Sequence, residues 1–156
     1  MSEQVTTSAV QGRTEETAGR GMTIPRHFTE AGRDPLAEIA FEKRRSAITE
    51  PGGKVVFEMD DAEVPVDWSQ LATDIVVSKY FRKAGVPGAG RETSVKQVVR
   101  RIVRAIRTYG EEQGYFRTAP DAEAFADELT YLLITQRGAF NSPVWFNCGL
   151  HHEYGI

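Results

Sequence analysis

The residues best suited to chemistry crowd into residues 138–149, which read GAFNSPVWFNCG. Pro143 cannot donate a backbone hydrogen bond and biases Ser142 toward an extended conformation, so a helix arriving from upstream should end here. Asn141 and Ser142 would then lie on a polar turn, where a hydroxyl, an amide and free backbone N–H groups can hold an anion such as a phosphate. The simpler alternative is an ordinary connection in which these two side chains cap backbone groups.

The sequence predicts a short buried strand directly after this turn. Residues 144–146 (Val-Trp-Phe) have high strand propensity, and residues 147–149 (Asn-Cys-Gly) are turn formers. Cys148 is the only cysteine of the chain, so it cannot form an internal disulfide or a multi-cysteine zinc site. His151 and His152 are adjacent and would point apart, so we expect exposed or loop-packed side chains and no metal site.

The composition predicts one soluble domain or fragment in a reducing compartment. The chain has 156 residues, of which 40% are hydrophobic and 26% charged, as in an average globular protein. A net charge of -3 gives no argument for nucleic-acid or membrane binding. The apolar runs are far shorter than the roughly 20 residues that cross a bilayer, and the chain starts without an apolar signal-peptide core. We therefore expect a cytoplasmic protein without nucleic-acid or membrane partners.

The first third of the chain is predicted to contain a tail and a hairpin. Residues 1–33 are rich in polar residue types and carry only scattered hydrophobic ones, which predicts a disordered tail. Residues 54–59 read as a strand that follows a Pro-Gly-Gly turn and pairs with residues 41–48 as a hairpin. The acidic residues 60–63 are expected to form a solvated loop.

Three helices are predicted downstream of the hairpin. The first starts with Asp67 as its cap and continues to residue 83, and the third covers residues 118–137. The second opens at Ser94, where Gln97 completes a capping box, and one of its faces is apolar. Its other side is expected to be a solvated basic surface, formed by Lys96, Arg100, Arg101, Arg104 and Arg107.

Several of these segments together resemble one enzyme family. Residues 140–147 (FNSPVWFN) are similar to a signature near the start of the catalytic barrel in adenosylcobalamin-dependent (class II) ribonucleotide reductases. Other matching pieces follow in the order of that family and extend the resemblance over residues 34–156. They are Phe41-Glu-Lys-Arg44, Trp68-Ser69, Ser78-Lys-Tyr-Phe-Arg82 and Ser94-Val-Lys-Gln97.

The resemblance implies a fold and a domain organisation. The fold is mainly α with a short β-hairpin, an N-terminal helical region that leads into the first strand of a ten-stranded α/β barrel. After the disordered tail, residues 34–138 would form the mainly helical domain. Residues 139–156 would be the truncated start of the catalytic barrel, most of which is missing.

The resemblance also implies an activity for the longer enzyme. Such enzymes convert ribonucleotides to 2′-deoxyribonucleotides for DNA synthesis, by a thiyl radical mechanism that adenosylcobalamin, a cobalt cofactor, initiates. The class would be that of the ribonucleoside-diphosphate reductases, with either di- or triphosphates as substrates. The implied partners are the ribonucleotide, the remainder of the reductase chain and a thioredoxin-type or other dithiol reductant. A homodimer of the full-length enzyme is also compatible with the resemblance.

Individual residues take their roles from the matching positions. Ser142 would help to hold the substrate phosphates, with Asn141 in support. Cys148 matches a position that accepts a small apolar residue, and the first redox cysteine of the family lies further on, so we expect a buried, inert thiol. No catalytic residue is therefore assigned in this fragment, which is expected to be inactive by itself.

A non-catalytic helical binding or regulatory module is the alternative. In this hypothesis the arginine-lined face of the second helix contacts an acidic partner. Charge reversal at Arg100, Arg104 and Arg107 would abolish partner binding in such a module, but would leave nucleotide reduction largely intact in a reductase. The reading frame beyond Ile156 also separates the two, because a downstream coding sequence with further cysteines would support the fragment hypothesis.

Overall fold

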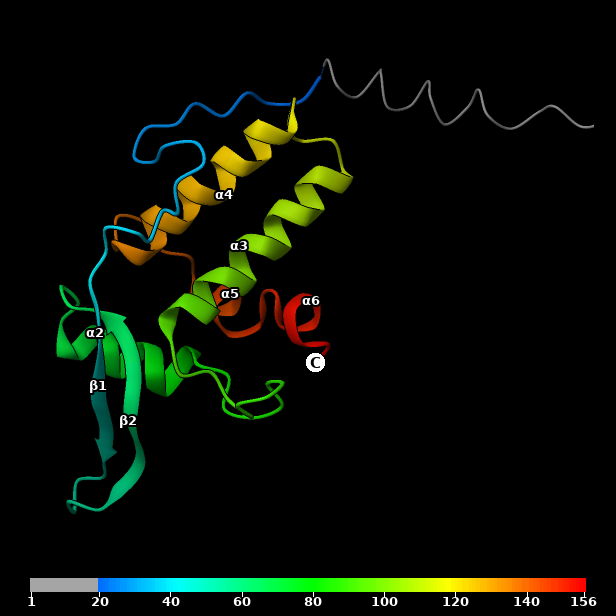
Figure 1. Cartoon of the computed structure of the whole chain (residues 1–156). Coiled ribbons are helices and arrows are strands. Elements are labelled where there is room, and N and C mark those ends of the chain that lie inside the picture. The colour runs from blue at the N-terminus through cyan, green and yellow to red at the C-terminus, as the bar shows by residue number, and fades with distance from the viewer. Residues whose placement is uncertain (1–19) are drawn as a thin grey trace, which may run out of the picture.

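The computed structural model describes residues 20–156, in which two long helices lie side by side. They are α3 (Val95–Glu112) and α4 (Ala119–Ile134), and the short turn between them makes them antiparallel (Figure 1). The capping box predicted for the second helix is confirmed, because the Ser94 N–H donates to the Gln97 side chain at 3.0 Å and the Ser94 hydroxyl accepts from α3. The box satisfies N–H groups that the first helical turn leaves unpaired.

Helix α4 begins where the sequence predicted and ends slightly earlier. Its N-cap is Thr118, whose hydroxyl donates to Asp121 at 2.6 Å and whose N–H donates to the same carboxylate at 3.1 Å. Pro120 lies in the first turn, where its missing N–H leaves no hydrogen bond unmade. The helix ends at Ile134, and soon afterwards Gln136 adopts a left-handed backbone conformation with φ 57°.

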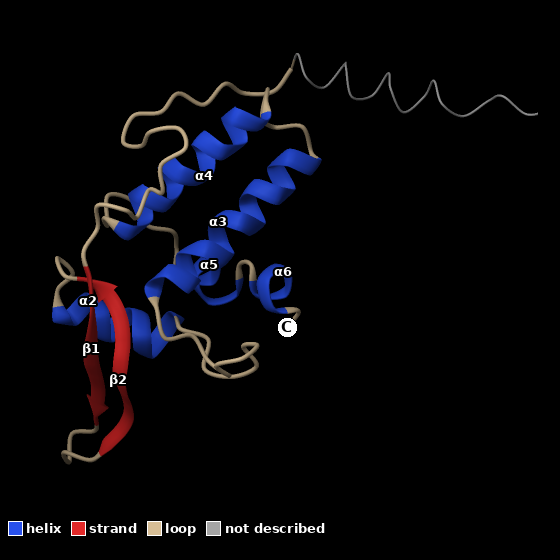
Figure 2. Ribbon diagram, viewed as in Figure 1, coloured by secondary structure: helices blue, strands red, loops and turns tan. Residues whose placement is uncertain are grey.

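The predicted hairpin is confirmed and is longer than expected. Strands β1 (Phe41–Thr49) and β2 (Val55–Pro65) pair in antiparallel register, with two irregularities along the ladder (Figure 2). Residues 60–63 belong to β2, so the prediction of a loop there is wrong. Ala62 and Val64 are completely buried on one face of β2, whereas Asp60 lies at the irregularity between Arg44 and Ser46, which shifts the alternation of side chains and leaves it exposed.

The first predicted helix is present as two short pieces. It consists of α2 (Gln70–Ile75), which continues directly as a π-helical turn, η1 (Val76–Tyr80). The predicted cap Asp67 is wrong, because Ser69 is the N-cap and its hydroxyl accepts a hydrogen bond from the Ala72 N–H at 3.1 Å. The helical path therefore starts later and stops earlier than the apolar stripe indicated.

The core lies where the hairpin, α2, η1, α3 and α4 meet. Trp68 connects it to α4, since its indole N–H donates to the backbone carbonyl of Ile134 at 2.8 Å. A mainly helical region with a short hairpin is thus confirmed, whereas the ten-stranded barrel, which residues 20–156 do not contain, stays a prediction. Within the same residues, no helix combines the length and the apolarity that crossing a bilayer requires.

Residues 20–33 run along α4, although the sequence predicted disorder there (Figure 1). The carboxylate of Glu128 accepts hydrogen bonds from the N–H groups of Phe28, at 3.0 Å, and of Thr29, at 2.9 Å. The Thr29 hydroxyl donates to the same carboxylate at 2.6 Å. These contacts contradict the disorder prediction for residues 20–33, and the rest of the predicted tail, residues 1–19, lies outside the described residues.

Candidate functional site

The segment with the predicted site residues forms a short helix, α5 (Ser142–Asn147), and not the predicted strand. Asn141 is its N-cap and Pro143 lies in its first turn, where a fixed φ and a missing N–H are both tolerated. Trp145 is buried, and its indole N–H donates to the backbone carbonyl of Phe140 at 2.8 Å. The strand prediction is wrong because the packing of this tryptophan outweighs the local strand preference.

The two predicted site residues, Asn141 and Ser142, are exposed at the start of α5. The Ser142 hydroxyl oxygen lies 3.2 Å from the Tyr80 hydroxyl oxygen, and either group can be the donor. The Asn141 side chain makes no capping hydrogen bond to α5, so the simpler expectation of a cap does not hold for this residue. A hydroxyl and a carboxamide are therefore both accessible and can hydrogen-bond a polar ligand.

Tyr80, at the end of η1, links this segment to the helical region. Its ring stacks on Trp145 with 5.9 Å between the ring centroids and lies tilted against Phe146 at 5.3 Å. A cavity of about 220 Å³ lies beside Tyr80 and Trp145. Aromatic pairs of this kind contribute about 0.5–1.5 kcal/mol each beyond the burial of their surface. The ring contacts therefore help to fix the position of Ser142 relative to η1.

Arg101, predicted on the exposed basic surface, is completely buried. Its guanidinium Nε donates to the Glu92 carboxylate at 2.9 Å, and both side chains of this ion pair are inaccessible to solvent. The other guanidinium nitrogens donate to three backbone carbonyls of residues distant in the sequence. The distances are 3.2 Å to the carbonyl of Tyr80, 2.7 Å to that of Trp145 and 2.7 Å to that of Cys148. The surface prediction is therefore wrong for this residue.

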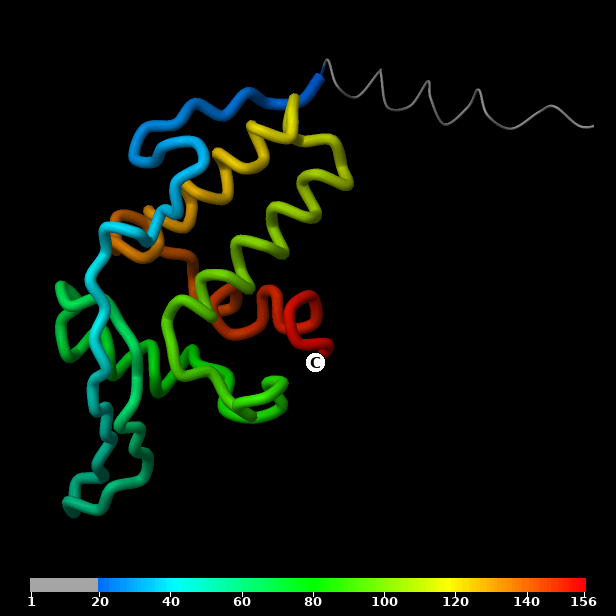
Figure 3. Tube along the Cα trace, viewed as in Figure 1, coloured from blue at the N-terminus to red at the C-terminus, as the bar shows by residue number. Residues whose placement is uncertain are grey.

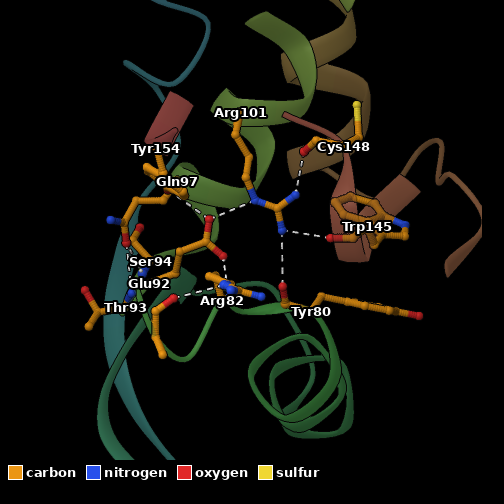
Figure 4. A network of polar contacts seen from close by, with 11 residues as sticks. Tyr80, Arg82, Glu92, Thr93, Ser94, Gln97, Arg101, Trp145, Cys148 and Tyr154 are labelled. Carbon is orange, nitrogen blue, oxygen red and sulfur yellow. Dashed lines mark hydrogen bonds and ion pairs between the residues drawn. The ribbon is translucent and has the colours of Figure 1, made fainter. Parts of the chain in front are cut away.

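Glu92 completes this buried network from the loop before α3. Its carboxylate accepts hydrogen bonds from the Arg82 N–H at 2.7 Å and from the Tyr154 hydroxyl at 2.9 Å (Figure 4). Burial raises the pKa of Tyr154, and the neighbouring Glu92 carboxylate raises it further, so the phenol stays a proton donor. Removing one member of such a pair leaves a buried charge without a partner, which costs about 3–5 kcal/mol.

The chain after α5 passes close to α3 (Figure 3). Gly149 lies in this segment, against the backbone of Arg101. This residue has φ 80°, and a Cβ atom there would lie only 2.0 Å from the backbone carbonyl oxygen of Arg101. Glycine is therefore required both for the left-handed backbone and for the close approach. Helix α6 (Leu150–Tyr154) follows and places Tyr154 against Glu92.

The remaining candidate ligands in this region are not arranged for metal binding or for redox chemistry. Cys148 is partly buried; burial raises the pKa of its thiol, and the nearby Arg101 guanidinium lowers it by less. A thiol with a raised pKa is a poor nucleophile. The inert role of Cys148 stays a prediction. His151 and His152 are exposed on α6, and across residues 20–156 no three His, Cys, Asp or Glu side chains are grouped to hold a metal ion.

The outer face of α3 carries fewer free charges than its sequence indicates. Arg104 pairs with Glu153 at 3.1 Å, and Arg107 pairs with Glu111 at 3.1 Å. With Arg101 buried as well, the basic surface expected for the binding-module hypothesis is largely neutralised. The structure thus gives that hypothesis no specific support.

Comparison with known proteins gives one consistent match. Residues 42–136 match the family described as class II vitamin B12-dependent ribonucleotide reductase. The chain is 49% identical over 125 residues to the vitamin B12-dependent ribonucleotide reductase of Rhodopirellula baltica, which covers 80% of this chain and 12% of that protein. The corresponding enzyme of Agrobacterium fabrum is 42% identical over 167 residues, covering 86% of this chain and 13% of that protein.

A third relative agrees with these two. The vitamin B12-dependent ribonucleotide reductase of Streptomyces coelicolor is 46% identical over 134 residues, covering 85% of this chain and 14% of that protein. The chain thus spans about one eighth of the length of the curated relatives it matches. The family match covers more than half of the chain, including the hairpin, α2, η1, α3 and α4. This chain belongs to the family of class II vitamin B12-dependent ribonucleotide reductases.

Proposed function

We propose that this chain is the N-terminal part of an enzyme that reduces ribonucleotides to 2′-deoxyribonucleotides for DNA synthesis. The proposal rests on the family match and on the relatives described above, which are named vitamin B12-dependent ribonucleotide reductases. The full-length enzyme would act in the cytoplasm by thiyl radical chemistry, with adenosylcobalamin as cofactor and a dithiol as reductant. The chain itself would supply scaffold and part of the binding site for the substrate phosphates.

The accessible hydroxyl of Ser142 is the observation that carries the phosphate role. When the Tyr80 hydroxyl donates to the Ser142 oxygen, the Ser142 proton remains free to be donated to a phosphate oxygen. The Asn141 carboxamide, which makes no capping bond to α5, can donate a second hydrogen bond to the same group. Hydrogen bonds to a charged partner contribute about 1.5–3 kcal/mol each, so the loss of one should weaken binding about tenfold or more.

The described residues do not fit the cofactor. One cavity of the described residues has a volume of about 460 Å³ and another about 220 Å³, and a corrin ring with its nucleotide loop and adenosyl group is much larger than either. The larger cavity, between residues 34–41 and helices α3 and α4, is lined by no histidine or cysteine. We propose that cobalamin and the radical and redox cysteines belong to other parts of the full-length reductase, and we assign no catalytic residue here.

Substitution of Ser142 in the full-length reductase tests the phosphate role. Ser142→Ala should raise the KM for the ribonucleotide about tenfold and leave kcat within about twofold, since the lost hydrogen bond serves binding. Ser78→Ala is the matched control, because the Ser78 hydroxyl donates to the Ile75 carbonyl at the end of α2, at 3.4 Å. An unchanged KM in Ser142→Ala, or an equal rise in Ser78→Ala, would refute the phosphate role.

A further inference from the structure

We propose that Arg101 and Glu92 are positioning residues for substrate binding, because they hold Ser142 and its partner Tyr80 in a fixed relation. This inference rests on the proposed phosphate role of Ser142. Neither charged side chain touches the solvent, so neither can contact a nucleotide itself. Their effect on the substrate would pass through the backbone of the segments that they bind.

The first step concerns how α5 is held. Arg101 donates to the backbone carbonyls of Trp145 and Cys148, both at 2.7 Å, which lie in the last turn of α5 and directly after it. These carbonyls have no intrahelical partner, since the last turn of any helix leaves its acceptors free. A buried guanidinium therefore fixes the end of the same six-residue helix that begins with Ser142.

The second step concerns the partner of Ser142. The same guanidinium donates to the backbone carbonyl of Tyr80 at 3.2 Å (Figure 4). The hydroxyl of the Tyr80 side chain lies 3.2 Å from the Ser142 hydroxyl. One side chain thus binds both segments that determine where the Ser142 hydroxyl lies. Glu92 keeps the guanidinium in this orientation through the bond to its Nε atom.

The third step separates positioning from simple packing. A buried ion pair can often be replaced by apolar side chains with little loss of stability, so stability alone does not explain this one. Apolar side chains cannot satisfy three carbonyl oxygens in fixed directions, whereas the planar guanidinium with its five donors can. Lysine would keep the charge that Glu92 needs but offers a single nitrogen, so Arg101→Lys should preserve the ion pair and lose the alignment of the carbonyls.

The test uses the full-length reductase with Arg101→Lys and, as a second variant, Glu92→Gln combined with Arg101→Met, which leaves no unpaired buried charge. Arg104→Lys is the control, because Arg104 lies on the same helix and pairs with Glu153 at the surface. Circular dichroism confirms that each variant folds. We expect both test variants to raise the KM for the ribonucleotide at least fivefold with kcat within about twofold, and the control to resemble the wild type.

Two further readouts distinguish positioning from a structural role. Amide hydrogen exchange of Trp145 and Cys148 should become faster in both test variants, because the end of α5 is released. Ser142→Ala combined with Arg101→Lys should raise KM no further than Ser142→Ala alone, since both changes disable the same contact.

The outcomes separate this inference from the proposed function. If Ser142→Ala raises KM but the Arg101 variants do not, or if the two effects multiply, the positioning role is refuted while the phosphate role stands. If Ser142→Ala leaves KM unchanged, the phosphate role is refuted and the functional part of this inference falls with it. Unchanged hydrogen exchange in α5 would refute the anchoring of α5 by Arg101, whatever the kinetics.

Discussion

Replacement of Gly149 by alanine should destabilise the protein far more than the same change at another left-handed glycine. A residue with a Cβ atom loses about 1–2 kcal/mol in the left-handed conformation, and this applies equally to Gly149 with φ 80° and Gly155 with φ 72°. At Gly155 nothing lies within 4 Å of the added atom. At Gly149 the added Cβ would lie 2.0 Å from the Arg101 carbonyl oxygen, which no backbone tolerates.

The cost at Gly149 follows from the movement that this overlap forces. Ordinary contact begins at 3.4 Å, so the chain must shift by about 1 Å or more away from α3. The adjacent hydrogen bond from Arg101 to the Cys148 carbonyl, now 2.7 Å long, would then be stretched or broken, and a bond from a charged donor contributes about 1.5–3 kcal/mol. We therefore expect a loss of about 3 kcal/mol or more for Gly149→Ala and of about 1 kcal/mol for Gly155→Ala.

Urea-induced unfolding followed by tryptophan fluorescence measures this difference. Trp68 and Trp145 are both buried, so their emission reports on the helical core and on α5. For a domain of this size, 3 kcal/mol corresponds to a decrease in Tm of about 6–12 °C, which provides a second measurement. Equal losses of stability in Gly149→Ala and Gly155→Ala would show that the close approach to α3 is not present and would refute the reasoning.

Three further predictions follow from single contacts. Ser94→Ala removes the N-cap of α3 and should lower the free energy of unfolding by about 1 kcal/mol; no change in the urea midpoint would contradict the capping box. Cys148→Ala should leave ribonucleotide reduction by the full-length enzyme within about twofold of wild type, whereas loss of activity would give the thiol a redox role. Burial acts to raise the pKa of Glu128, but the Thr29 hydroxyl and nearby N–H groups lower it overall, so its contacts should persist above pH 4.5 and be lost as the pH falls through the lowered value. Amide exchange of residues 27–29 should accelerate in that acidic range. Protection that does not depend on pH would contradict the role of the ionised Glu128 carboxylate in holding these residues.

The elements that could be predicted well from the sequence are those whose signals lie between residues close together along the chain. Helix α3 was located from its apolar spacing and from Ser94 and Gln97, three residues apart, and both signals are local. The hairpin was located from a turn between two strand-forming runs, which is local as well. Such patterns predict an element without any knowledge of what packs on it.

The predictions that failed depend on partners far away in the sequence. Arg101 looked like a surface residue because its acceptors, the carbonyls of Tyr80, Trp145 and Cys148, come from other segments. One available signal was its position three residues after Val98 and directly before Ile102, on the flank of the apolar stripe of α3. Residues 20–33 were predicted disordered for the same reason, because Glu128 lies about a hundred positions downstream.

The short helix α5 shows how tertiary packing can outweigh propensity. The Val-Trp-Phe run favours a strand, but an asparagine followed two residues later by a proline is also a typical helix start. That signal was present in the sequence and predicts the observed N-cap and first turn. The burial of Trp145 against Tyr80 then stabilises the helix, and no local pattern contains this contact.

The most direct test of the central proposal is a ribonucleotide reduction assay on the full-length product of the gene that encodes this chain. The assay is run with a dithiol reductant, with and without adenosylcobalamin, on the wild type and on Ser142→Ala. We predict deoxyribonucleotide formation that requires the cofactor, together with a KM for the ribonucleotide about tenfold higher in the variant. An intact full-length protein that forms no deoxyribonucleotide with the cofactor present would contradict the proposed function.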